Sequence, residues 1–244
     1  TQHRETTTDN DEMMINKVVI LAGGKGTRMR ENTELIPKPM VEIGGMPVLM
    51  HIIKHFESFS DFDFFVLTGY KEEVIVDYFK KNKYKNINII STGLDTNTGG
   101  RIKKVKEIIN EDFFMTYGDG LSDINIEEID KFHFEHKKIA TISVNKPVSR
   151  FGLVDFDENG KVNSFIEKPI LDSYVNMGYM ILKPEVFNFI NDDIPFENQP
   201  LKDLAKNQEI YAFRHNGFFR PMDTHREYLE LNQLWVDGKA PWVR

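Results

Sequence analysis

Val18-Val19-Ile20-Leu21-Ala22-Gly23-Gly24-Lys25-Gly26-Thr27-Arg28 is the stretch that decides the fold, and Lys38-Pro39 follows shortly after it. The apolar residues at its start are typical of a strand that is covered on both faces of a sheet. The glycines that follow allow positive φ and a close approach of backbone N–H groups to an anion. We therefore expect a buried strand that runs into a phosphate-binding turn.

Two well-known phosphate loops do not match this stretch. A Walker A loop requires Gly-Lys followed by Ser or Thr, whereas Lys25 is followed by Gly26. Starting from Gly24 and Gly26, the dinucleotide fingerprint needs a third small residue at position 29, where Met29 would obstruct close helix packing. What remains is Gly-Gly-x-Gly-Thr-Arg with a downstream Lys-Pro.

Arg28 and Lys38 bracket the glycine loop with two cations. Alone, each would be a solvated surface cation, and the glycines alone would suit an ordinary strand-to-helix turn. Together they suit a triphosphate chain, whose charge must be held by local cations because the net charge is -7 and the pI is 5.6. The same acidic balance argues against a nucleic-acid-binding face.

The loop resembles the signature of the sugar-phosphate nucleotidyltransferases, and the likeness is greatest to the cytidylyltransferases that act on glucose 1-phosphate. It covers about residues 15 to 244 and includes further segments in the same order. These are Lys38-Pro39-Met40-Val41-Glu42-Ile43-Gly44-Gly45, Thr98-Gly99-Gly100-Arg101, Tyr117-Gly118-Asp119-Gly120, Glu167-Lys168-Pro169, Pro221-Met222-Asp223-Thr224 and Gly238-Lys239-Ala240-Pro241-Trp242. Each segment is weak alone, but together and in order they are specific.

The resemblance implies a role for particular residues. Those implied to bind the nucleotide are Leu21, Ala22, Gly23, Gly24, Gly26, Thr27, Arg28, Lys38, Thr98, Gly100, Arg101 and Gly118. Those implied to bind the acceptor are Tyr117, Glu167, Lys168 and Asn176, and those implied to hold Mg²⁺ are Asp119 and Asp223. The catalytic cations would be Arg28 and Lys38 on the triphosphate and Lys168 on the attacking phosphate.

The implied reaction transfers CMP from CTP to a phosphorylated small molecule, with glucose 1-phosphate as the expected acceptor. It would give pyrophosphate and CDP-glucose, a precursor for surface polysaccharide. Because the attacking phosphate is already an anion, no general base or covalent intermediate is needed, and the protein positions the reactants and neutralises charge.

Other functions stay open at this point. Three departures from the family lie near the acceptor side or a subunit contact: a short segment between Phe79 and Thr98, Met177 in place of glycine, and Ile170–Tyr174 in place of a glycine-containing loop. A different sugar phosphate or a polyol phosphate such as glycerol phosphate is therefore an alternative acceptor, and UTP or dTTP an alternative donor. A glycosyltransferase would use a similar sheet but consume a nucleotide sugar. An inactive regulatory module is the remaining class.

The alternation of elements predicts an α/β fold, with a Rossmann-like, mixed but mainly parallel sheet flanked by helices and an added β-hairpin in the acceptor region. Ligands of such sheets bind at the carboxyl ends of the strands. Expected strands are 18–21, 64–68, 87–90, 113–116, 139–144, 175–182 and 210–213, with 38–43 extended and a hairpin of 152–156 and 161–166. Expected helices are 47–58, a helix with Val74 to Phe79 on its face, one from Thr98 through Ile109, 126–136, one from Pro184 and 225–236.

Several other patterns are interpreted as non-catalytic. Asp61 with Asp63 and Asp155 with Asp157 look like metal-binding acidic pairs, but they lie at a strand entry and in a hairpin turn, where solvated turn roles are expected. His133 and His136 share a helix face without a zinc pattern, so a surface role is expected.

The bulk properties bound the setting of the protein. The chain has no cysteine, which excludes disulfides and cysteine zinc sites and fits a reducing compartment. No apolar run approaches the roughly 20 residues of a membrane span. We expect a cytoplasmic homo-oligomer without nucleic-acid or membrane partners. Residues 1–13 are polar and are expected to be a disordered or non-native extension before a single domain over 14–244, since Met13 or Met14 suits a translation start.

Overall fold

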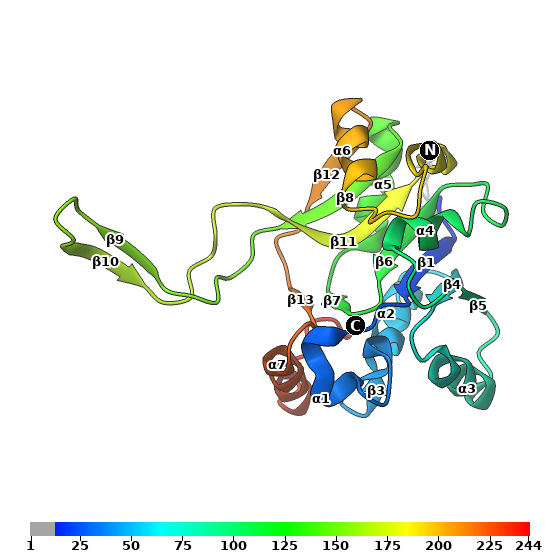
Figure 1. Cartoon of the computed structure of the whole chain (residues 1–244), viewed down its shortest axis with the longest axis horizontal. Helices are drawn as coiled ribbons and strands as arrows, with labels where there is room; N and C mark the ends of the chain where they lie inside the picture. The colour runs from blue at the N-terminus through cyan, green and yellow to red at the C-terminus, as the bar shows by residue number, and fades with distance from the viewer. Residues whose placement is uncertain (1–12) are drawn as a thin grey trace, which may run out of the picture.

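The structure, a computed structural model, describes residues 13–244, and a seven-stranded sheet forms the centre of this part (Figure 1). Its strands lie in the order β12 (Ile210–Arg214), β8 (Ala140–Asn145), β11 (Val175–Leu182), β6 (Phe113–Tyr117), β1 (Lys17–Ala22), β4 (Asp63–Thr68) and β5 (Ile87–Ser91). Strand β11 pairs antiparallel with β6 and β8, while the other neighbouring pairs are parallel. The predicted mixed, mainly parallel sheet is confirmed.

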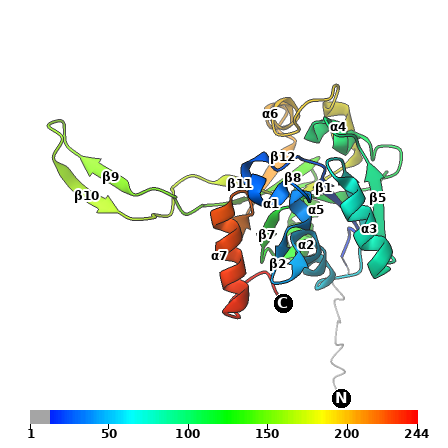
Figure 2. The ribbon, with the colours of Figure 1, turned by 60° about the horizontal axis from the view of Figure 1, so that its bottom comes forward.

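Helices cover both faces of the sheet, as the alternation of side chains along β1 requires. Val18, Ile20 and Ala22 pack into one core with α2 (Val48–Glu57), α3 (Glu72–Asn82), α5 (Ile126–His136) and α7 (His225–Val236). Val19 and Leu21 pack into a second core with α4 (Thr98–Lys103), the 3-10 helix η3 (Pro184–Phe189) and α6 (Gln199–Lys206). The result is a three-layer arrangement (Figures 1 and 2).

The predicted hairpin is a two-stranded ribbon that projects far from the sheet (Figures 1 and 2). It consists of β9 (Leu153–Phe156) and β10 (Val162–Ile166), paired antiparallel. Its turn is held by Asp157, whose Oδ1 accepts hydrogen bonds from the backbone N–H of Asn159 (2.9 Å) and Lys161 (3.0 Å). Every residue of both strands is exposed, so the ribbon itself lies away from the core.

Some local predictions are wrong. Lys38–Met40 is a 3-10 helix, η2, because Pro39 suits the first helical turn. The helix from Thr98 ends at Lys103 and continues as turns, in which Val105 and Ile109 are buried and Ile108 is exposed. The segment from Pro184 is 3-10 rather than α-helical. Strand β2 (Glu42–Ile43) is the end of the predicted extended segment, whereas the short strands β3 (Met46–Pro47), β7 (Gly120–Ser122) and β13 (Phe219–Pro221), and helix α6, were not expected from the sequence.

The ends and the surface add two observations. Of the predicted extension 1–13, only Met13 falls among the described residues, where it packs against the core. The division into an extension and a single domain therefore stays a prediction. Within residues 13–244, none of the helices combines the length and the apolar character that crossing a membrane requires.

Candidate active site

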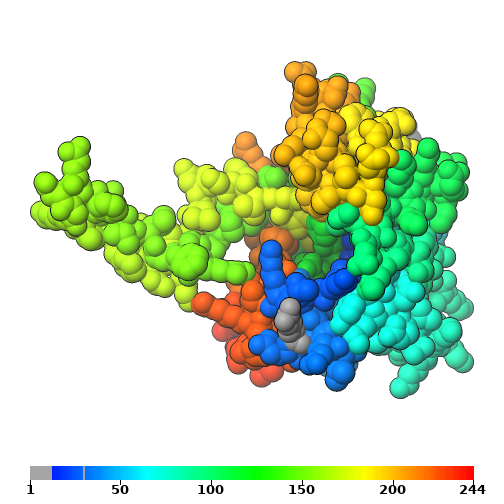
Figure 3. Space-filling view, viewed as in Figure 1, coloured from blue at the N-terminus to red at the C-terminus, as the bar shows by residue number. Residues whose placement is uncertain are grey.

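A cleft of about 350 Å³ opens where the loops after β1 and β6 meet. The space-filling view shows this face hollowed between the blue N-terminal segment and the yellow segment that leads to α6 (Figure 3). Of the predicted nucleotide-binding residues, the cleft is lined by Leu21, Ala22, Gly23, Gly24, Gly26, Lys38, Thr98, Arg101 and Gly118. Thr27, Arg28 and Gly100 lie outside its lining. The site is thus at the carboxyl ends of parallel strands, as predicted.

The glycine loop is shaped by a buried arginine. Arg101 is 4% exposed, and its guanidinium donates to the carbonyl oxygens of Gly23 (3.2 Å) and Gly93 (2.7 Å) and to Thr92 Oγ1 (2.7 Å). A Cβ added at Gly23 would lie 2.2 Å from Arg101 Nη1, so only glycine leaves room for this contact. Burial lowers the pKa of Arg101, but a guanidinium stays charged. Arg101 therefore holds the loop through its carbonyls, in addition to lining the cleft.

Gly118 joins the loop after β6 to the glycine loop. Its N–H donates to the carbonyl oxygen of Leu21 at 2.9 Å. An added Cβ would lie 2.9 Å from that same oxygen and 3.1 Å from a Pro39 ring carbon. The close approach explains why glycine precedes Asp119.

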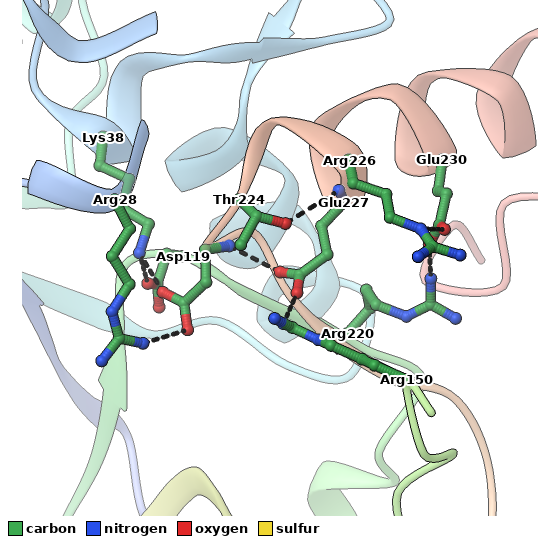
Figure 4. Close-up of polar contacts among 10 residues, drawn as sticks. Arg28, Lys38, Asp119, Arg150, Arg220, Thr224, Arg226, Glu227 and Glu230 are labelled. Atoms are coloured by element: carbon green, nitrogen blue, oxygen red, sulfur yellow. Dashed lines mark hydrogen bonds and ion pairs between the residues drawn. The ribbon is translucent and has the colours of Figure 1, made fainter. Parts of the chain in front are cut away.

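Lys38, which Figure 4 shows beside Asp119, brings together the two predicted metal ligands, Asp119 and Asp223. Lys38 Nζ lies 2.7 Å from Asp119 Oδ2 and also forms an ion pair with Asp223. Arg28 Nη1 lies 3.6 Å from Asp223 Oδ2. The N–H of Met222 donates to the carbonyl oxygen of Asp119 at 2.8 Å, which fixes the segment after β13 beside the segment after β6.

The charges of this cluster shift its titration. Burial alone would lower the pKa of Lys38, but the ion pairs with Asp119 and Asp223 outweigh it and raise that pKa above its usual value. Burial raises the pKa of the Asp119 carboxyl, and the charge of Lys38 opposes this shift. Lys38, which belongs to η2 (Lys38–Met40), therefore keeps its positive charge in the site.

The chemistry of the pair fits a magnesium ion. Mg²⁺ is typically held by one or two carboxylates together with phosphate oxygens and water. Asp119 and Asp223 already share one cation, the Lys38 ammonium, so their oxygens face a common point. Among residues 13–244 no group of three or more His, Cys, Asp or Glu side chains is placed to hold a metal. The carboxylate pair thus fits a metal ion whose other ligands are phosphate oxygens and water.

A second, larger cavity of about 1230 Å³ adjoins the first and shares Tyr117 and Asp119 with it. Three of the four predicted acceptor residues, Tyr117, Lys168 and Asn176, line this cavity, whereas Glu167 does not. Lys168 is exposed and has a φ of 48°, just beyond the end of β10. Asn176 is exposed toward the cavity, and its Oδ1 accepts a hydrogen bond from Gly178 N at 2.8 Å. Met177, the unexpected residue, is 3% exposed and packs into the core.

Tyr117 stands between the two cavities at the end of β6. Its hydroxyl donates a hydrogen bond to Glu197, and burial together with this carboxylate raises the pKa of Tyr117. Glu197 Oε2 also accepts from Thr98 Oγ1 at 2.7 Å. Sequence reasoning missed Glu197, because nothing in its local pattern marks it as part of the cleft.

Arg150 and Glu227 were also missed. Both line the larger cavity, and they form an ion pair with each other. Glu227 has a sequence signal, since Thr224-x-x-Glu227 has the capping-box pattern at the start of α7, although its side chain accepts from Asp223 N instead of Thr224 N. Arg150, in the chain segment between β8 and β9, has none.

The patterns interpreted as non-catalytic lie away from both cavities. Asp157 occupies the ribbon turn, and Asp63 is exposed at the start of β4, as predicted. The expected surface role of His133 is wrong, because its ring is fully buried and bonds Thr141 Oγ1 (2.7 Å) and Asp112 Oδ2 (3.1 Å). Its place on the inner face of α5 put it there.

Comparisons with known proteins agree with this geometry. Residues 17–235 match the model of the nucleotidyl transferase family. The chain is 42% identical over 253 residues to a glucose-1-phosphate cytidylyltransferase of Salmonella typhi, covering 93% of this chain and 98% of the relative. It is 39% identical over 251 residues to a probable glucose-1-phosphate cytidylyltransferase of Bacillus subtilis, with the same coverage. Among solved structures, HddC from Yersinia pseudotuberculosis has a TM-score of 0.73 at 27% identity, covering 91% of this chain and 100% of that chain.

Proposed function

The chain belongs to the nucleotidyl transferase family, and from this premise we propose that it transfers CMP from CTP to glucose 1-phosphate, giving CDP-glucose and pyrophosphate. The family is the one that the glycine loop and the later motifs predicted. The choice of CTP and glucose 1-phosphate is supported by the relatives named glucose-1-phosphate cytidylyltransferase, whose matches cover 93% of this chain.

The observation that carries the proposal is the pair of adjoining cavities that share Asp119 and Tyr117. The smaller cavity has the glycine loop and Lys38, which suit a triphosphate. The larger has Lys168 and Asn176, which suit a phosphorylated sugar. A nucleotide in one and an acceptor in the other would meet at the shared carboxylate.

In the proposed reaction a phosphate oxygen of the acceptor attacks the α-phosphorus of CTP. The new bond joins this oxygen to the α-phosphorus, while the bond to the β-phosphate bridging oxygen breaks and its electron pair leaves with pyrophosphate. Lys38 and Arg28 offset charge on the triphosphate, and Lys168 aligns the attacking phosphate. These cations act by position and charge, and no proton has to be removed first.

Asp119 and Asp223 are the residues that would hold Mg²⁺. When bound, the ion offsets charge on the phosphate oxygens around the α-phosphorus. The carboxylates keep their place through Lys38 and through the backbone bond between Met222 and Asp119.

The test is pyrophosphate release with Mg²⁺, in which CTP, UTP, dTTP, ATP and GTP are each paired with glucose 1-phosphate, mannose 1-phosphate and glycerol phosphate. We expect rapid release for CTP with glucose 1-phosphate and little release for the other pairs. Release with CTP only when another acceptor is supplied would reject glucose 1-phosphate as the acceptor but retain cytidylyl transfer. Release with UTP or dTTP alone would reject CTP, and no release from any pair would reject the enzyme.

We also propose that the enzyme is a cytoplasmic homo-oligomer and that the β9–β10 ribbon contacts a second copy. Large apolar side chains on the ribbon and at its base are exposed, among them Phe151 (78%), Phe156 (62%) and Phe165 (60%). An isolated two-stranded hairpin is marginal in water, so such a surface needs a cover. Residues 1–12 contain no large apolar side chain and do not suit this role.

The oligomer is tested by light scattering after size exclusion, with Phe151→Ser, Phe156→Ser and Phe165→Ser combined in one variant. We expect the wild type to have a multiple of the 28.5 kDa chain mass and the variant to have a smaller mass. A monomeric wild type, or an unchanged mass in the variant, would reject the ribbon contact.

A further inference from the structure

A buried carboxylate of α7 is paired with an arginine from the base of the ribbon (Figure 4). Arg150 Nη2 forms an ion pair with Glu227 Oε1. The Glu227 side chain is 7% exposed, whereas that of Arg150 is 57% exposed toward the larger cavity. A buried carboxylate needs such a countercharge, because an uncompensated charge in the protein interior is strongly destabilising.

The other oxygen of Glu227 supports Asp223. Glu227 Oε2 accepts a hydrogen bond from the backbone N–H of Asp223 at 2.8 Å. The N–H of Glu227 donates in turn to Thr224 Oγ1 at 3.3 Å, which caps α7. The carboxylate of Asp223 points the other way, to Lys38 and Arg28. Glu227 thus fixes the backbone from which a proposed metal ligand projects.

The arginine side of the pair belongs to the acceptor side of the site. Ser149, the neighbour of Arg150, donates its N–H to the carbonyl oxygen of Pro169 at 2.7 Å. Pro169 follows Lys168 directly, so Arg150 and Lys168 lie on two tied segments at the ribbon base. A shift of this base would move Lys168 and would loosen the support of Asp223 at the same time.

We propose that Arg150 and Glu227 form a positioning pair that holds Asp223 for metal binding and links it to the acceptor side at the ribbon base. This inference rests on the proposed function, since it concerns the metal ligand of that reaction. Both residues act through the backbone of Asp223, as residues behind metal ligands commonly do.

The capping box offers a purely structural alternative. In it, Glu227 serves only to start α7, and Arg150 is a dispensable surface cation. The two accounts differ for Arg150, which takes no part in the cap. They also differ for Glu227→Gln, which keeps an acceptor for Asp223 N–H but loses the charge that holds Arg150.

The test is calorimetric titration of Mg²⁺ into the full chain in the presence of a non-hydrolysable CTP analogue. Arg150→Ala and Glu227→Gln should each weaken Mg²⁺ binding about tenfold, the size usual for residues that support metal ligands. The double variant should bind Mg²⁺ no more weakly than the weaker-binding single variant, because both substitutions remove the same ion pair. Arg150→Lys keeps a cation and should recover part of the loss.

Matched measurements separate this effect from folding and from the reaction. Glu230→Gln removes the ion pairs of Glu230 with Arg220 and Arg226 on the same helix and should leave Mg²⁺ binding within about twofold of wild type. Thermal unfolding of each variant identifies any that fail to fold, in which case Arg150→Lys carries the test.

The inference would be overturned if Arg150→Ala bound Mg²⁺ as tightly as the wild type, or if the wild type did not bind Mg²⁺. Additive losses of Mg²⁺ affinity in the double variant would also overturn it. Failure of the proposed function is seen separately, as absence of pyrophosphate release by the wild type. The titration uses an unreactive nucleotide and does not depend on that release.

Discussion

The guanidinium of Arg101 donates a hydrogen bond across 3.2 Å to the carbonyl oxygen of Gly23 and so ties α4 to the glycine loop. Because the same group also bonds Gly93 and Thr92, its removal would leave buried carbonyl oxygens without partners. Arg101→Met should lower the free energy of unfolding by about 2 to 4 kcal/mol and raise the KM for CTP about tenfold. Urea unfolding and steady-state kinetics measure the two effects.

Lys103 provides the control for this substitution. It lies on the same helix, and its Nζ donates to the carbonyl oxygen of Ile190 at 2.6 Å, away from the glycine loop. Lys103→Met should lower stability without changing the KM for CTP. An equal rise in KM for both variants would show that Arg101 acts only through general stability.

Two neighbouring glycines should respond differently to the same added methyl group. At Gly23 the new Cβ would lie 2.2 Å from Arg101 Nη1, whereas at Gly24 it would meet no atom within 4 Å. Gly23→Ala should therefore lower the melting temperature, and Gly24→Ala should leave it within about 2 °C of wild type. Gly24→Ala should nevertheless weaken CTP binding, because its methyl group enters the cleft. A stable Gly23→Ala protein with normal CTP affinity would contradict this account of the loop.

Lys168 is the cation assigned to the attacking phosphate. It lines the larger cavity and not the cleft of the glycine loop. Lys168→Ala should lower kcat about 10² to 10³-fold, as loss of a positioned charge commonly does, and leave the Kd for CTP nearly unchanged. Lys161→Ala, at the ribbon turn, is the matched control and should keep wild-type turnover. An equal loss of turnover and CTP affinity in Lys168→Ala would remove the acceptor role.

Histidines with lowered pKa values should make the protein less stable in mild acid. Burial, followed by the nearby His133, lowers the pKa of His136 from 6.5 to about 4, and burial also lowers the pKa values of His51 and His55. Below pH 6.5 these histidines bind protons in the unfolded chain but remain neutral in the folded protein. The free energy of unfolding therefore falls as the pH drops toward about 4.

His136→Gln isolates one part of this dependence. His136 is half-buried, so its own share is about 1 kcal/mol after screening by solvent. The variant should lose less stability than wild type between neutral pH and pH values near 5. Thermal unfolding over this range measures the difference, and identical curves for both proteins would refute the prediction.

The sequence predicted well those elements whose periodicity and caps agree. Helix α5 begins after Asn125, which caps Glu128 N at 3.0 Å, and ends at His136 as expected. Helix α7 and strand β11 also have the predicted bounds. Two-residue and three-residue strands such as β3 and β7 carry too few side chains to show a period, so they could be found only in the structure.

The candidate site was predictable where a residue type serves the ligand directly. The glycine loop, Lys38, Asp119 and Asp223 meet in one place, as the motifs implied. Residues that act through other residues could not be found this way. The bonds of Arg101 to carbonyl oxygens, and the pairing of Arg150 with Glu227, depend on chain segments that meet only on folding.

If a phosphate oxygen of the acceptor attacks the α-phosphorus of CTP, all oxygen atoms of that phosphate stay in the nucleotide sugar. The most direct test uses glucose 1-phosphate that carries a heavy-oxygen label in all its phosphate oxygens, with mass spectrometry of both products. We expect CDP-glucose that retains the whole label and pyrophosphate that contains none. Label in the pyrophosphate, or no CDP-glucose at all while CTP is consumed, would contradict it.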